Sequence, residues 1–452
     1  MKGCGLEDIA AIAAALGTAW AGENHVVNGI VTDTRAVQPG DVFLALAGER
    51  FDAHEFLAEA RRAGALAAIV SRPVDDPLPQ LRVADTRLAL GLLGQARRLA
   101  WGGPLVAVTG NSGKTTVKEM LAALLGRRGA TLATVGNLNN DIGAPLTLLR
   151  LDGEHRQAVV ELGANHLGEI AWTASLARPQ VAVITNVTGA HVGEFGGMGQ
   201  IAQAKAEILA GLDADGVAVL NRDDAFYPFW HRLAGTREIL DFGVTSQARI
   251  HCVDLADDKN GRYSFTLVQD GVALGRVRLA LLGLHNVRNA LAAAAAALAL
   301  GLPADDVIAG LDELEAMPGR MAPLRGIRGC RLLDDTYNAN PGAMKAALEV
   351  LAQMPAPRWC FLGAMGELGK ASDELHEDVG HHARRLGIDF LGTLGAAAEP
   401  AARAYGEPGC HFANWEALLR HAQNQLPSGA SVLVKGSRSA GMERLIAALR
   451  AD

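Results

Sequence analysis

Short apolar segments alternate with longer segments of helical periodicity through the middle of the chain. Four of the apolar runs have the character of buried strands and span residues 104–109, 158–161, 181–185 and 217–220. Helical patterns separate them. A strand that alternates with a helix in this way predicts a parallel sheet with right-handed crossovers.

The pattern changes after the fourth of these runs. Residues 239–281 alternate in the manner of strands and predict a small antiparallel extension of the sheet. Helical patterns from 285 to 314 follow and contain the longest apolar run, residues 290–300. A membrane span needs roughly 20 residues, so this run is too short to cross a bilayer and predicts a helix of the core.

Two further blocks of mixed strands and helices flank this centre. The first ends near Trp101 and holds short strand-like runs at 30–31, 42–46 and 67–70. The last begins near Pro318, and its strand-like runs lie at 331–334, 359–362, 390–391 and 431–434. Helical stretches alternate with these runs, which predicts a second doubly wound, Rossmann-like unit.

The sequence therefore predicts an α/β protein of three domains. The expected domains are a smaller N-terminal α/β domain (1–101), a central domain with a parallel sheet (102–316) and a C-terminal Rossmann-like domain (317–452). The length of 452 residues agrees with this division, because domains average roughly 150 residues.

Composition and charge narrow the class of protein further. Hydrophobic residues make up 49% of the chain and charged residues 20%, which excludes a disordered chain. Aromatic residues are only 5%, and Ala and Gly are abundant, which favours α/β layers over a β-sandwich. Lys and Arg number 42 against 49 Asp and Glu, a net charge of −7. Such a chain has no general attraction to nucleic acid or to an anionic membrane.

The cysteines and the N-terminus indicate a cytoplasmic location. None of the five cysteines forms a Cys-x-x-Cys pair, which argues against a zinc knuckle or a dithiol motif. An odd number of widely spaced cysteines is typical of reduced thiols in the cytosol. Glu7 and Asp8 also stand where a signal peptide needs its apolar stretch.

The strongest chemical signal is a glycine-rich loop between an apolar strand and a helix. Its glycines let backbone N–H groups surround an anion, and the helix N-terminus adds a favourable dipole. Lys114 supplies a charge to the β- and γ-phosphates, and Thr115 offers a hydroxyl to Mg²⁺. The usual pattern has a glycine where this chain has Val108, so the match is imperfect. The segment still predicts a P-loop nucleotide site made of Thr109, Gly110, Asn111, Ser112, Gly113, Lys114, Thr115 and Thr116.

Polar residues at strand ends are candidates for metal ligands. Glu161 ends an apolar strand, where it faces the crevice in which ligands bind in open α/β sheets, or else caps a helix or lies on the surface. His191 follows the next strand and is either a ligand or a structural histidine. Lys205 lies on an amphipathic helix, and the pattern alone assigns it to the solvated face.

Further candidates lie at the start of a helix and in the last block. Asn286 either caps a helix or faces a purine ring. Arg320 follows a Pro-Gly turn at the domain junction, from which its guanidinium could reach a transferring phosphate. One of the two acids Asp334 and Asp335 could bind ribose hydroxyls, and residues 435–439 resemble either an anion pocket or a basic turn.

Together these segments resemble the Mur ligases, over essentially the whole chain and in the same order. The segments that carry the resemblance are 32–35, 39–41, 109–115, 136–140, 143–149, 161–165, 190–191, 204–207, 285–289, 318–320 and 334–341. The forms Gly-Asn-Leu-Asn-Asn (136–140) and Tyr-Asn-Ala-Asn-Pro (337–341) point to the family member that adds a dipeptide. The motif Asp-Asn-Pro-Arg of the member that adds the third residue is absent.

The resemblance implies an ATP-dependent ligase of peptidoglycan precursor synthesis, with roles in cell wall biogenesis, cell shape and cell division. The γ-phosphoryl of ATP would pass to the free carboxylate of UDP-N-acetylmuramoyl-tripeptide. The amine of D-alanyl-D-alanine would then attack the acyl phosphate, giving the pentapeptide, ADP and phosphate. Catalysis would consist mainly of positioning and charge neutralisation.

The resemblance also implies roles for individual residues. Two Mg²⁺ ions are expected, one held by Thr115 and Glu161 and the other by His191 beside a carbamylated Lys205. The implied catalytic residues are Lys114, His191, Lys205 and Arg320. Adenine would meet Asn286, the γ-phosphate Arg320 and the ribose Asp335.

The substrates would lie on the outer domains. Thr34 and Arg35 would anchor the uridine diphosphate, and Asn338 with residues 435–439 would meet the acceptor dipeptide. The resemblance further implies a monomer whose third domain closes over ATP, and residues 314–320 are the expected hinge. Two alternatives stay open: a folylpolyglutamate synthase-like enzyme or another Mur ligase, and a P-loop nucleotide switch that performs no synthesis.

Overall fold

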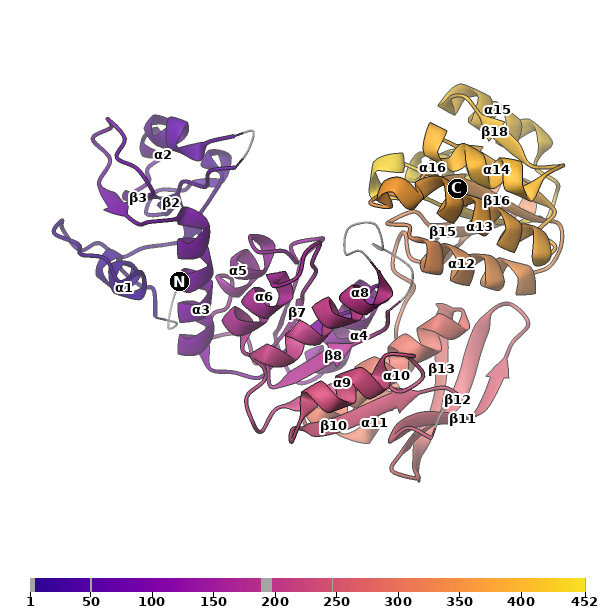
Figure 1. Cartoon of the computed structure of the whole chain (residues 1–452), viewed down its shortest axis with the longest axis horizontal. Helices are drawn as coiled ribbons and strands as arrows, with labels where there is room; N and C mark the ends of the chain where they lie inside the picture. Colours follow the sequence, from indigo (N-terminus) through magenta and orange to yellow (C-terminus); the bar gives the residue numbers. More distant parts are fainter. Residues whose placement is uncertain (1–4, 49–50, 188–196, 246, 452) are drawn as a thin grey trace.

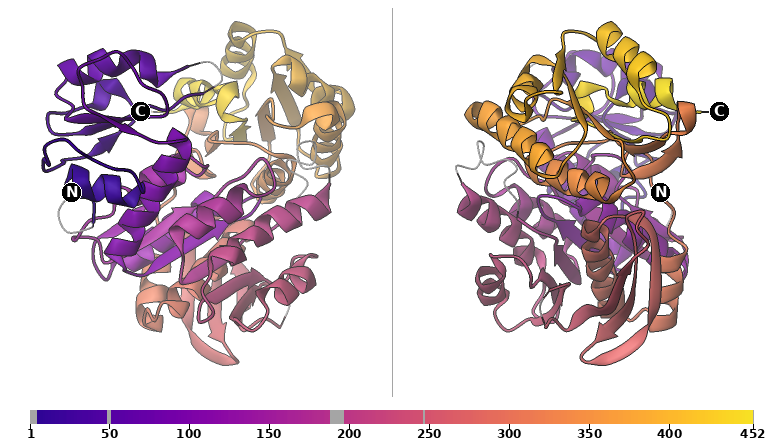
Figure 2. Two further views of the ribbon diagram at one scale, coloured as in Figure 1. Left: turned by 60° about the vertical axis from the view of Figure 1, so that its left-hand side comes forward. Right: turned by 90° about the vertical axis from the view of Figure 1, so that its right-hand side faces the viewer.

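The computed structural model describes residues 5–48, 51–187, 197–245 and 247–451, and it contains three α/β domains (Figure 1). Each is built around its own sheet, of four, nine and six strands. In Figure 1 the central domain lies between the N-terminal and the C-terminal domain, and in both views of Figure 2 these outer domains lie above it. The prediction of a three-domain α/β protein is confirmed.

The N-terminal sheet is parallel throughout, in the order β1-β2-β3-β4. Its strands are β1 (Ile30–Val31), β2 (Val42–Leu44), β3 (Ala67–Val70) and β4 (Gln80–Arg82). The first three coincide with predicted runs. Strand β4 was not predicted, because it is short and only Leu81 is buried among its residues. The helices are α1 (Ile9–Ala15), α2 (Leu57–Arg62) and α3 (Thr86–Trp101).

Helix α3 joins the N-terminal domain to the central one. The carboxylate of Asp85 caps its start by accepting hydrogen bonds from two backbone N–H groups. The helix ends at Gly102, whose φ of 68° places it in the left-handed region. Gly94 lies so close to Pro145 of the central domain that a Cβ atom there would be 3.0 Å from the proline Cα. The helix is therefore packed tightly against the central domain.

The central sheet has the order β13-β12-β11-β10-β9-β8-β5-β7-β6. The strands are β5 (Leu105–Thr109), β6 (Thr131–Ala133), β7 (Gln157–Glu161), β8 (Val181–Ile184), β9 (Val217–Asn221), β10 (Glu238–Gly243), β11 (Ile250–Asp257), β12 (Arg262–Gln269) and β13 (Val272–Leu282). The predicted antiparallel extension is correct for β12 and β13. It is wrong for β10, which pairs parallel with β9 because a helix forms the crossover between them.

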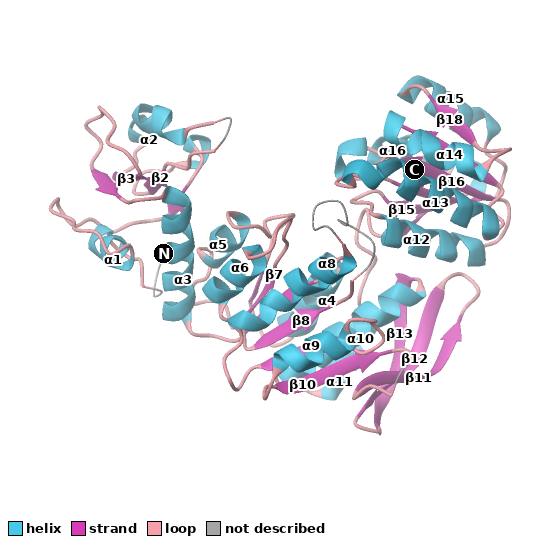
Figure 3. Cartoon of the chain, in the orientation of Figure 1, coloured by secondary structure: helices cyan, strands magenta, loops and turns pink. Residues whose placement is uncertain are grey.

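Helices cover both faces of this sheet (Figure 3). They are α4 (Lys114–Gly126), α5 (Gly143–Leu148), α6 (Glu169–Ala177), α8 (Met198–Ala206), α9 (Tyr227–Ala234), α10 (Leu284–Ala299) and α11 (Ala304–Asp312). Along β5, Val106 and Val108 point into one core, and Leu105 and Ala107 point into the other. Burial on both faces explains why the strands read as continuous apolar runs.

The alanine-rich helix α10 fills the core on one of these faces. Residues 290–297 are all buried, as the apolar run predicted. Within the described residues, no helix is both long enough and apolar enough to cross a membrane. The four described cysteines carry free thiols, which agrees with the expectation of reduced cysteines.

The C-terminal sheet has the order β14-β15-β19-β16-β17-β18 and is parallel except for the edge strand β14. Its strands are β14 (Ala322–Arg325), β15 (Arg331–Asp335), β16 (Arg358–Gly363), β17 (Phe390–Leu394), β18 (Cys410–Phe412) and β19 (Ser431–Lys435). Its helices are α12 (Pro341–Gln353), α13 (Ser372–Arg385), α14 (Glu399–Tyr405), α15 (Trp415–Gln425) and α16 (Glu443–Leu449). The predicted doubly wound unit is confirmed, and the edge strands β14 and β18 were missed.

Helix α12 contacts the central domain at both of its ends. At its start, the Asn340 amide nitrogen lies 3.2 Å from the Ser112 hydroxyl in the glycine-rich loop. Near its end, Val350 packs with Leu282 of β13 in a shared apolar cluster. The Tyr263 hydroxyl of β12 also donates to Gln353 Oε1 at 3.4 Å. The antiparallel extension thus supports the C-terminal domain.

Candidate active site

A cleft of about 590 Å³ lies between the central and C-terminal domains. The ends of β5, β7, β8 and β9 and the start of α10 line one side. The turn at 319–321, the end of β15 and the first turns of α12 line the other. The carboxyl ends of parallel strands from two sheets therefore face the same space, which is where α/β proteins bind their ligands.

The glycine-rich loop between β5 and α4 requires both of its glycines. Gly110 has a φ of 145°, and a Cβ atom there would lie 1.9 Å from the Thr185 hydroxyl. Gly113 has a φ of 82°, and its Cβ would lie 2.4 Å from Asn289 Oδ1. Asn186 fixes the loop by accepting from the Ser112 N–H at 3.0 Å. The predicted residues 109–116 thus form a cradle at a helix N-terminus, an arrangement that is suited to bind an anion.

Lys114 lies inside this cradle at the first position of α4. Its ammonium donates to the carbonyl oxygens of Gly110 at 2.8 Å and Asn111 at 3.3 Å. Burial lowers the pKa of this ammonium, and the nearby carboxylate of Glu161 opposes that shift. A desolvated cation surrounded by N–H donors is suited to bind a polyphosphate.

Glu161 offers the cleft one carboxylate oxygen that has no hydrogen-bond partner. The side chain is 3% exposed. Its Oε1 accepts from the Asn139 amide at 2.8 Å, whereas its Oε2 is buried without a hydrogen bond. An unpaired buried carboxylate oxygen is unfavourable unless a cation binds it. With the hydroxyl of Thr115 in the same cleft, this arrangement fits a Mg²⁺ ion, which prefers oxygen ligands.

A metal here would depend on few protein ligands. Among the residues whose positions are described, no group of three or more His, Cys, Asp and Glu side chains gathers in a way that could hold an ion. Mg²⁺ commonly takes one or two carboxylates and completes its shell with water and substrate phosphates. The predicted second ligand, His191, falls in 188–196, outside the described residues.

Lys205 of α8 is buried, at 2% exposure, so its assignment to a solvated helix face is wrong. Burial lowers the pKa of its ammonium to about 7, and the positive charge of Lys114 acts in the same direction. Glu207 and Glu169 oppose the shift. A large fraction of this amine is therefore neutral and nucleophilic near pH 7, which is the form that reacts with carbon dioxide.

Two asparagines line the cleft at the start of α10. The Asn286 amide donates to the Leu282 carbonyl at 2.8 Å, and its Oδ1 accepts from Asn289 at 3.0 Å. The helix cap is Gly283, so the alternative that Asn286 caps the helix is wrong. Both side chains are fixed in the wall of the cleft, beside the glycine-rich loop.

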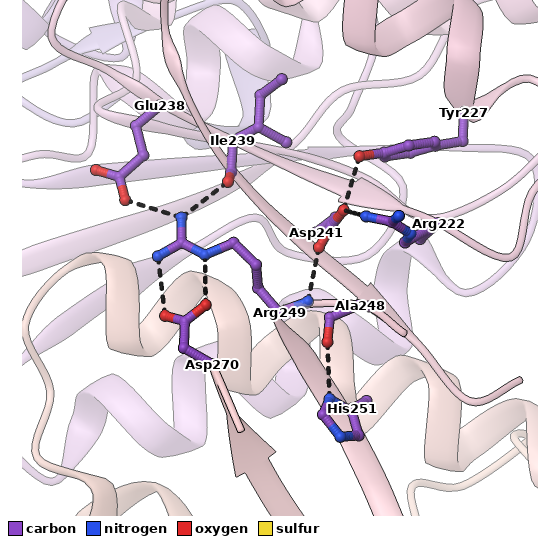
Figure 4. A network of polar contacts seen from close by, with 9 residues as sticks. All are labelled: Arg222, Tyr227, Glu238, Ile239, Asp241, Ala248, Arg249, His251 and Asp270. Atoms are coloured by element: carbon purple, nitrogen blue, oxygen red, sulfur yellow. Dashed lines mark hydrogen bonds and ion pairs between the residues drawn. The ribbon is translucent and has the colours of Figure 1, made fainter. Parts of the chain in front are cut away.

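A polar network supports the wall at the ends of β9 and β10 (Figure 4). The buried carboxylate of Asp241 accepts from the Tyr227 hydroxyl at 2.7 Å, from Arg222 at 2.7 Å and from the Arg249 N–H at 2.8 Å. Burial and the Asp241 carboxylate raise the pKa of Tyr227 to about 12. The Arg249 guanidinium in turn binds Asp270 at 2.8 Å. Arg222 directly precedes the cleft residues 223 and 224, so the network lies beside the wall of the cleft.

The C-terminal domain contributes the cationic side of the cleft. The Arg320 guanidinium carbon lies 4.2 Å from the centre of the Tyr337 ring, a cation–π contact. Asp335 faces the cleft and forms an ion pair with Lys435, with 2.6 Å between Oδ2 and Nζ. The other acid, Asp334, is used internally, because it accepts from the Gly319 N–H and from Thr336. Of the two acids that the sequence left open, Asp335 is the cleft residue.

The remaining predicted substrate residues lie in different places. Asn338 lines the cleft, and its backbone carbonyl accepts from Lys435 Nζ at 2.8 Å. Thr34 and Arg35 form a short helical turn in the N-terminal domain and do not line the cleft. Arg35 is 88% exposed and pairs with Asp33 at 2.6 Å. The guanidinium of Arg35 lowers the pKa of Asp33 to about 2.

Several cleft residues were not selected from the sequence. They include Asn139, Thr185, Asn186, Tyr337 and Asn340. Asn139 and Asn340 belong to the segments 136–140 and 334–341, which the sequence analysis marked only as part of a resemblance. Asn186 lies two residues after the end of strand β8. A search for polar residues at the end of every strand would have found it.

Models of three Mur ligase domains match this chain in succession. The Mur ligase family, catalytic domain matches residues 26–96, the Mur ligase middle domain 108–297, and the Mur ligase, glutamate ligase domain 319–438. The UDP-N-acetylmuramoyl-tripeptide--D-alanyl-D-alanine ligase of Escherichia coli is 45% identical over 435 residues, which cover 95% of each chain.

Solved structures agree with these matches. A crystal structure of MurF from Acinetobacter baumannii is 40% identical and has a TM-score of 0.89, covering 96% of this chain and 97% of that one. MurF ligase from Thermotoga maritima, solved with ADP, is 30% identical with a TM-score of 0.85 and covers 93% and 96%. This chain belongs to the Mur ligase family.

Proposed function

We propose that this protein uses ATP to join D-alanyl-D-alanine to UDP-N-acetylmuramoyl-tripeptide and thereby makes the UDP-N-acetylmuramoyl-pentapeptide of peptidoglycan synthesis. The E. coli relative that carries the name of this ligase matches almost the whole chain. The observation that carries the proposal is the cleft itself. It combines a phosphate loop and a carboxylate from one domain with Arg320 and Asp335 from another.

A ligase needs such a cleft because a carboxylate is a poor acyl donor. Transfer of the γ-phosphoryl group to the tripeptide carboxylate forms an acyl phosphate, and ADP leaves. The amine of the dipeptide then attacks the acyl carbon, and the tetrahedral intermediate releases phosphate as the peptide bond forms. Lys114 and Arg320 neutralise the negative charge that moves between these groups, and the loop N–H groups orient the phosphates.

The same cleft has groups suited to the nucleoside. We assign Asn286 to the adenine ring, since its amide is fixed in the wall formed by α10. We assign Asp335 to the ribose hydroxyls, since its ion pair with Lys435 holds the carboxylate toward the cleft. The cation–π contact with Tyr337 keeps Arg320 at the phosphate end.

Two Mg²⁺ ions would complete the site. Thr115 and Glu161 would hold one of them beside the phosphates, and His191 with a carbamylated Lys205 would hold the other. The metals would supply positive charge for the phosphates and the acyl oxygen. The unpartnered Oε2 of Glu161 and the lowered pKa of Lys205 support these assignments.

The two substrates would approach from the outer domains. Thr34 and Arg35 would bind the uridine diphosphate, and Asn338 with residues 435–439 would meet the acceptor dipeptide. We place the domain boundaries at 101/102 and 316/317 and the hinge for closure at 314–320. Since one chain supplies both sides of the cleft, we propose a monomer, and we place it in the cytoplasm, where ATP and nucleotide-linked precursors are available.

The direct test is phosphate release from ATP and Mg²⁺, with UDP-N-acetylmuramoyl-tripeptide and D-alanyl-D-alanine added singly and together. We expect phosphate only when both are present, in step with pentapeptide detected by mass. Tripeptides that end in meso-diaminopimelate and in lysine are both assayed. Hydrolysis that ignores both substrates would favour a nucleotide switch.

A panel of other substrates provides the control for specificity. It pairs the precursors of the other Mur ligases with their amino acids, and a folate with glutamate. Turnover of one of these pairs in preference to the tripeptide and dipeptide would replace the proposed substrates with that pair and keep the acyl-phosphate chemistry.

A further inference from the structure

Asn139 holds the Glu161 side chain in one orientation. Its amide nitrogen donates to Glu161 Oε1 at 2.8 Å. Since Oε1 is occupied, only the buried Oε2 is left without a hydrogen bond. A carboxylate held by one oxygen presents the other in a fixed direction, which is how an outer partner tunes a metal ligand.

Asn139 is itself fixed by its surroundings. Its N–H donates to the Asn137 carbonyl, and its own carbonyl accepts from the Gly163 N–H, both at 2.8 Å. The amide lies over Gly163, where a Cβ atom would be 3.1 Å from the amide carbon and oxygen. Residue 163 therefore has to be small for this contact to form.

A second contact holds the Glu161 backbone. Its N–H donates to the Thr134 hydroxyl at 3.0 Å, and the Thr134 carbonyl accepts from Lys118 Nζ at 2.9 Å. Thr134 and Lys118 are each 1% exposed. Lys118 lies on α4, the helix that begins at the phosphate loop. A buried ammonium thus connects that helix to the strand end that carries the carboxylate.

We propose that Asn139 is a positioning residue that fixes Glu161 so that its Oε2 is left to bind a divalent cation beside the phosphates. Thr134, held by Lys118, fixes the backbone of the same glutamate. This inference rests on the proposed use of a metal–nucleotide complex, and it requires neither the tripeptide nor the dipeptide. Asn139 and Thr134 contact Glu161, and Lys118 contacts Thr134. None of the three is assigned a contact with the reacting atoms.

The test measures Mn²⁺ binding by electron paramagnetic resonance in the presence of ADP, without either substrate. Asn139→Ala is expected to weaken Mn²⁺ binding about 10- to 100-fold, as loss of an outer partner does at metal sites. ADP binding without metal should be unchanged. Asn414→Ala, which removes an amide that caps α15 in the C-terminal domain, is the matched control and should leave Mn²⁺ binding unchanged.

Thr134→Val provides a second variant of nearly equal volume, in case Asn139→Ala does not fold. It removes the acceptor for the Glu161 N–H and should weaken Mn²⁺ binding in the same direction by a smaller factor. Wild-type affinity for Mn²⁺ in folded Asn139→Ala would overturn the proposal. If the ligase assay alone failed, the Mn²⁺ measurement would still test this proposal, because its readout is metal binding to the ADP complex.

Discussion

The lowered pKa of Lys205 predicts how the enzyme should respond to bicarbonate. Carbamylation joins the neutral amine to carbon dioxide, so a protonated lysine must first lose its proton. At pH 7.5 an amine with a pKa of about 7 is about three-quarters neutral, whereas one at the ordinary 10.5 is neutral in only about one molecule per thousand. Burial of the side chain therefore supplies a reactive amine at physiological pH.

The pH dependence has a definite form. At a fixed bicarbonate concentration, carbamate formation from the neutral amine releases water and no proton, while formation from the ammonium also releases one proton. The bicarbonate concentration that gives half-maximal activity should fall as the pH rises toward 7 and then level off. Between pH 6 and 9 the expected fall is about 11-fold for a pKa of about 7 and about a thousandfold for 10.5.

The assay uses enzyme stripped of carbon dioxide at low pH and returned to sealed buffers of known bicarbonate content. Ligase activity is followed against bicarbonate at each pH. Lys205→Ala should lose most activity, ignore bicarbonate and regain part of its rate with a small carboxylate such as acetate. A half-saturating concentration that keeps falling tenfold per pH unit above pH 8 would refute the lowered pKa. Full activity of Lys205→Ala would refute the carbamate.

Substitutions at four other positions test separate parts of the cleft. Glu161→Gln should lower kcat/KM at least about a hundredfold and raise the Mg²⁺ concentration needed for activity, which a Mg²⁺ titration detects. Gly113→Ala places a side chain at a φ of 82°, a strain of about 1–2 kcal/mol, so calorimetry should find ATP binding weakened by about tenfold or more. Asn340→Asp keeps the acceptor that caps α12 but removes the donor to the phosphate loop, so the KM for ATP should rise at an unchanged melting temperature. Asn340→Ala should also lower the melting temperature, because it loses the helix cap, which contributes about 1 kcal/mol of stability. Tyr337→Leu should reduce kcat several-fold by releasing Arg320, and Tyr337→Phe, which keeps the ring, should not; equal effects of the two would argue against the cation–π contact.

The sequence predicted the fold well wherever strands are buried on both faces. Strands such as β5 and β8 read as continuous apolar runs because each face meets its own helix layer. Edge strands such as β14 and β18 have fewer buried positions and left no comparable signal. The direction of β10 was mistaken because a helix and a turn can both precede a strand of the same composition.

The site was predictable to the extent that it follows strand ends and helix starts. The glycine-rich loop and Glu161 were identified in this way. The burial of Lys205 was not, because a lysine on an amphipathic helix reads as solvated until the packing of α8 is known. Asn139 was overlooked for a similar reason. Its partner Glu161 lies 22 residues away in the chain, at the end of β7, which pairs with the strand β6 that precedes Asn139.

Because α12 contacts the central domain at both ends, a small rotation of the C-terminal domain about one end displaces the other end by several ångströms. The helix has 13 residues, so at 1.5 Å per residue its ends are about 20 Å apart. Suppose the C-terminal domain turns about the apolar contact between Val350 and Leu282. A turn of about 10° then carries Asn340 about 3 Å away from Ser112, along an arc set by the length of the helix. The phosphate end of the cleft can thus open while the other end stays packed.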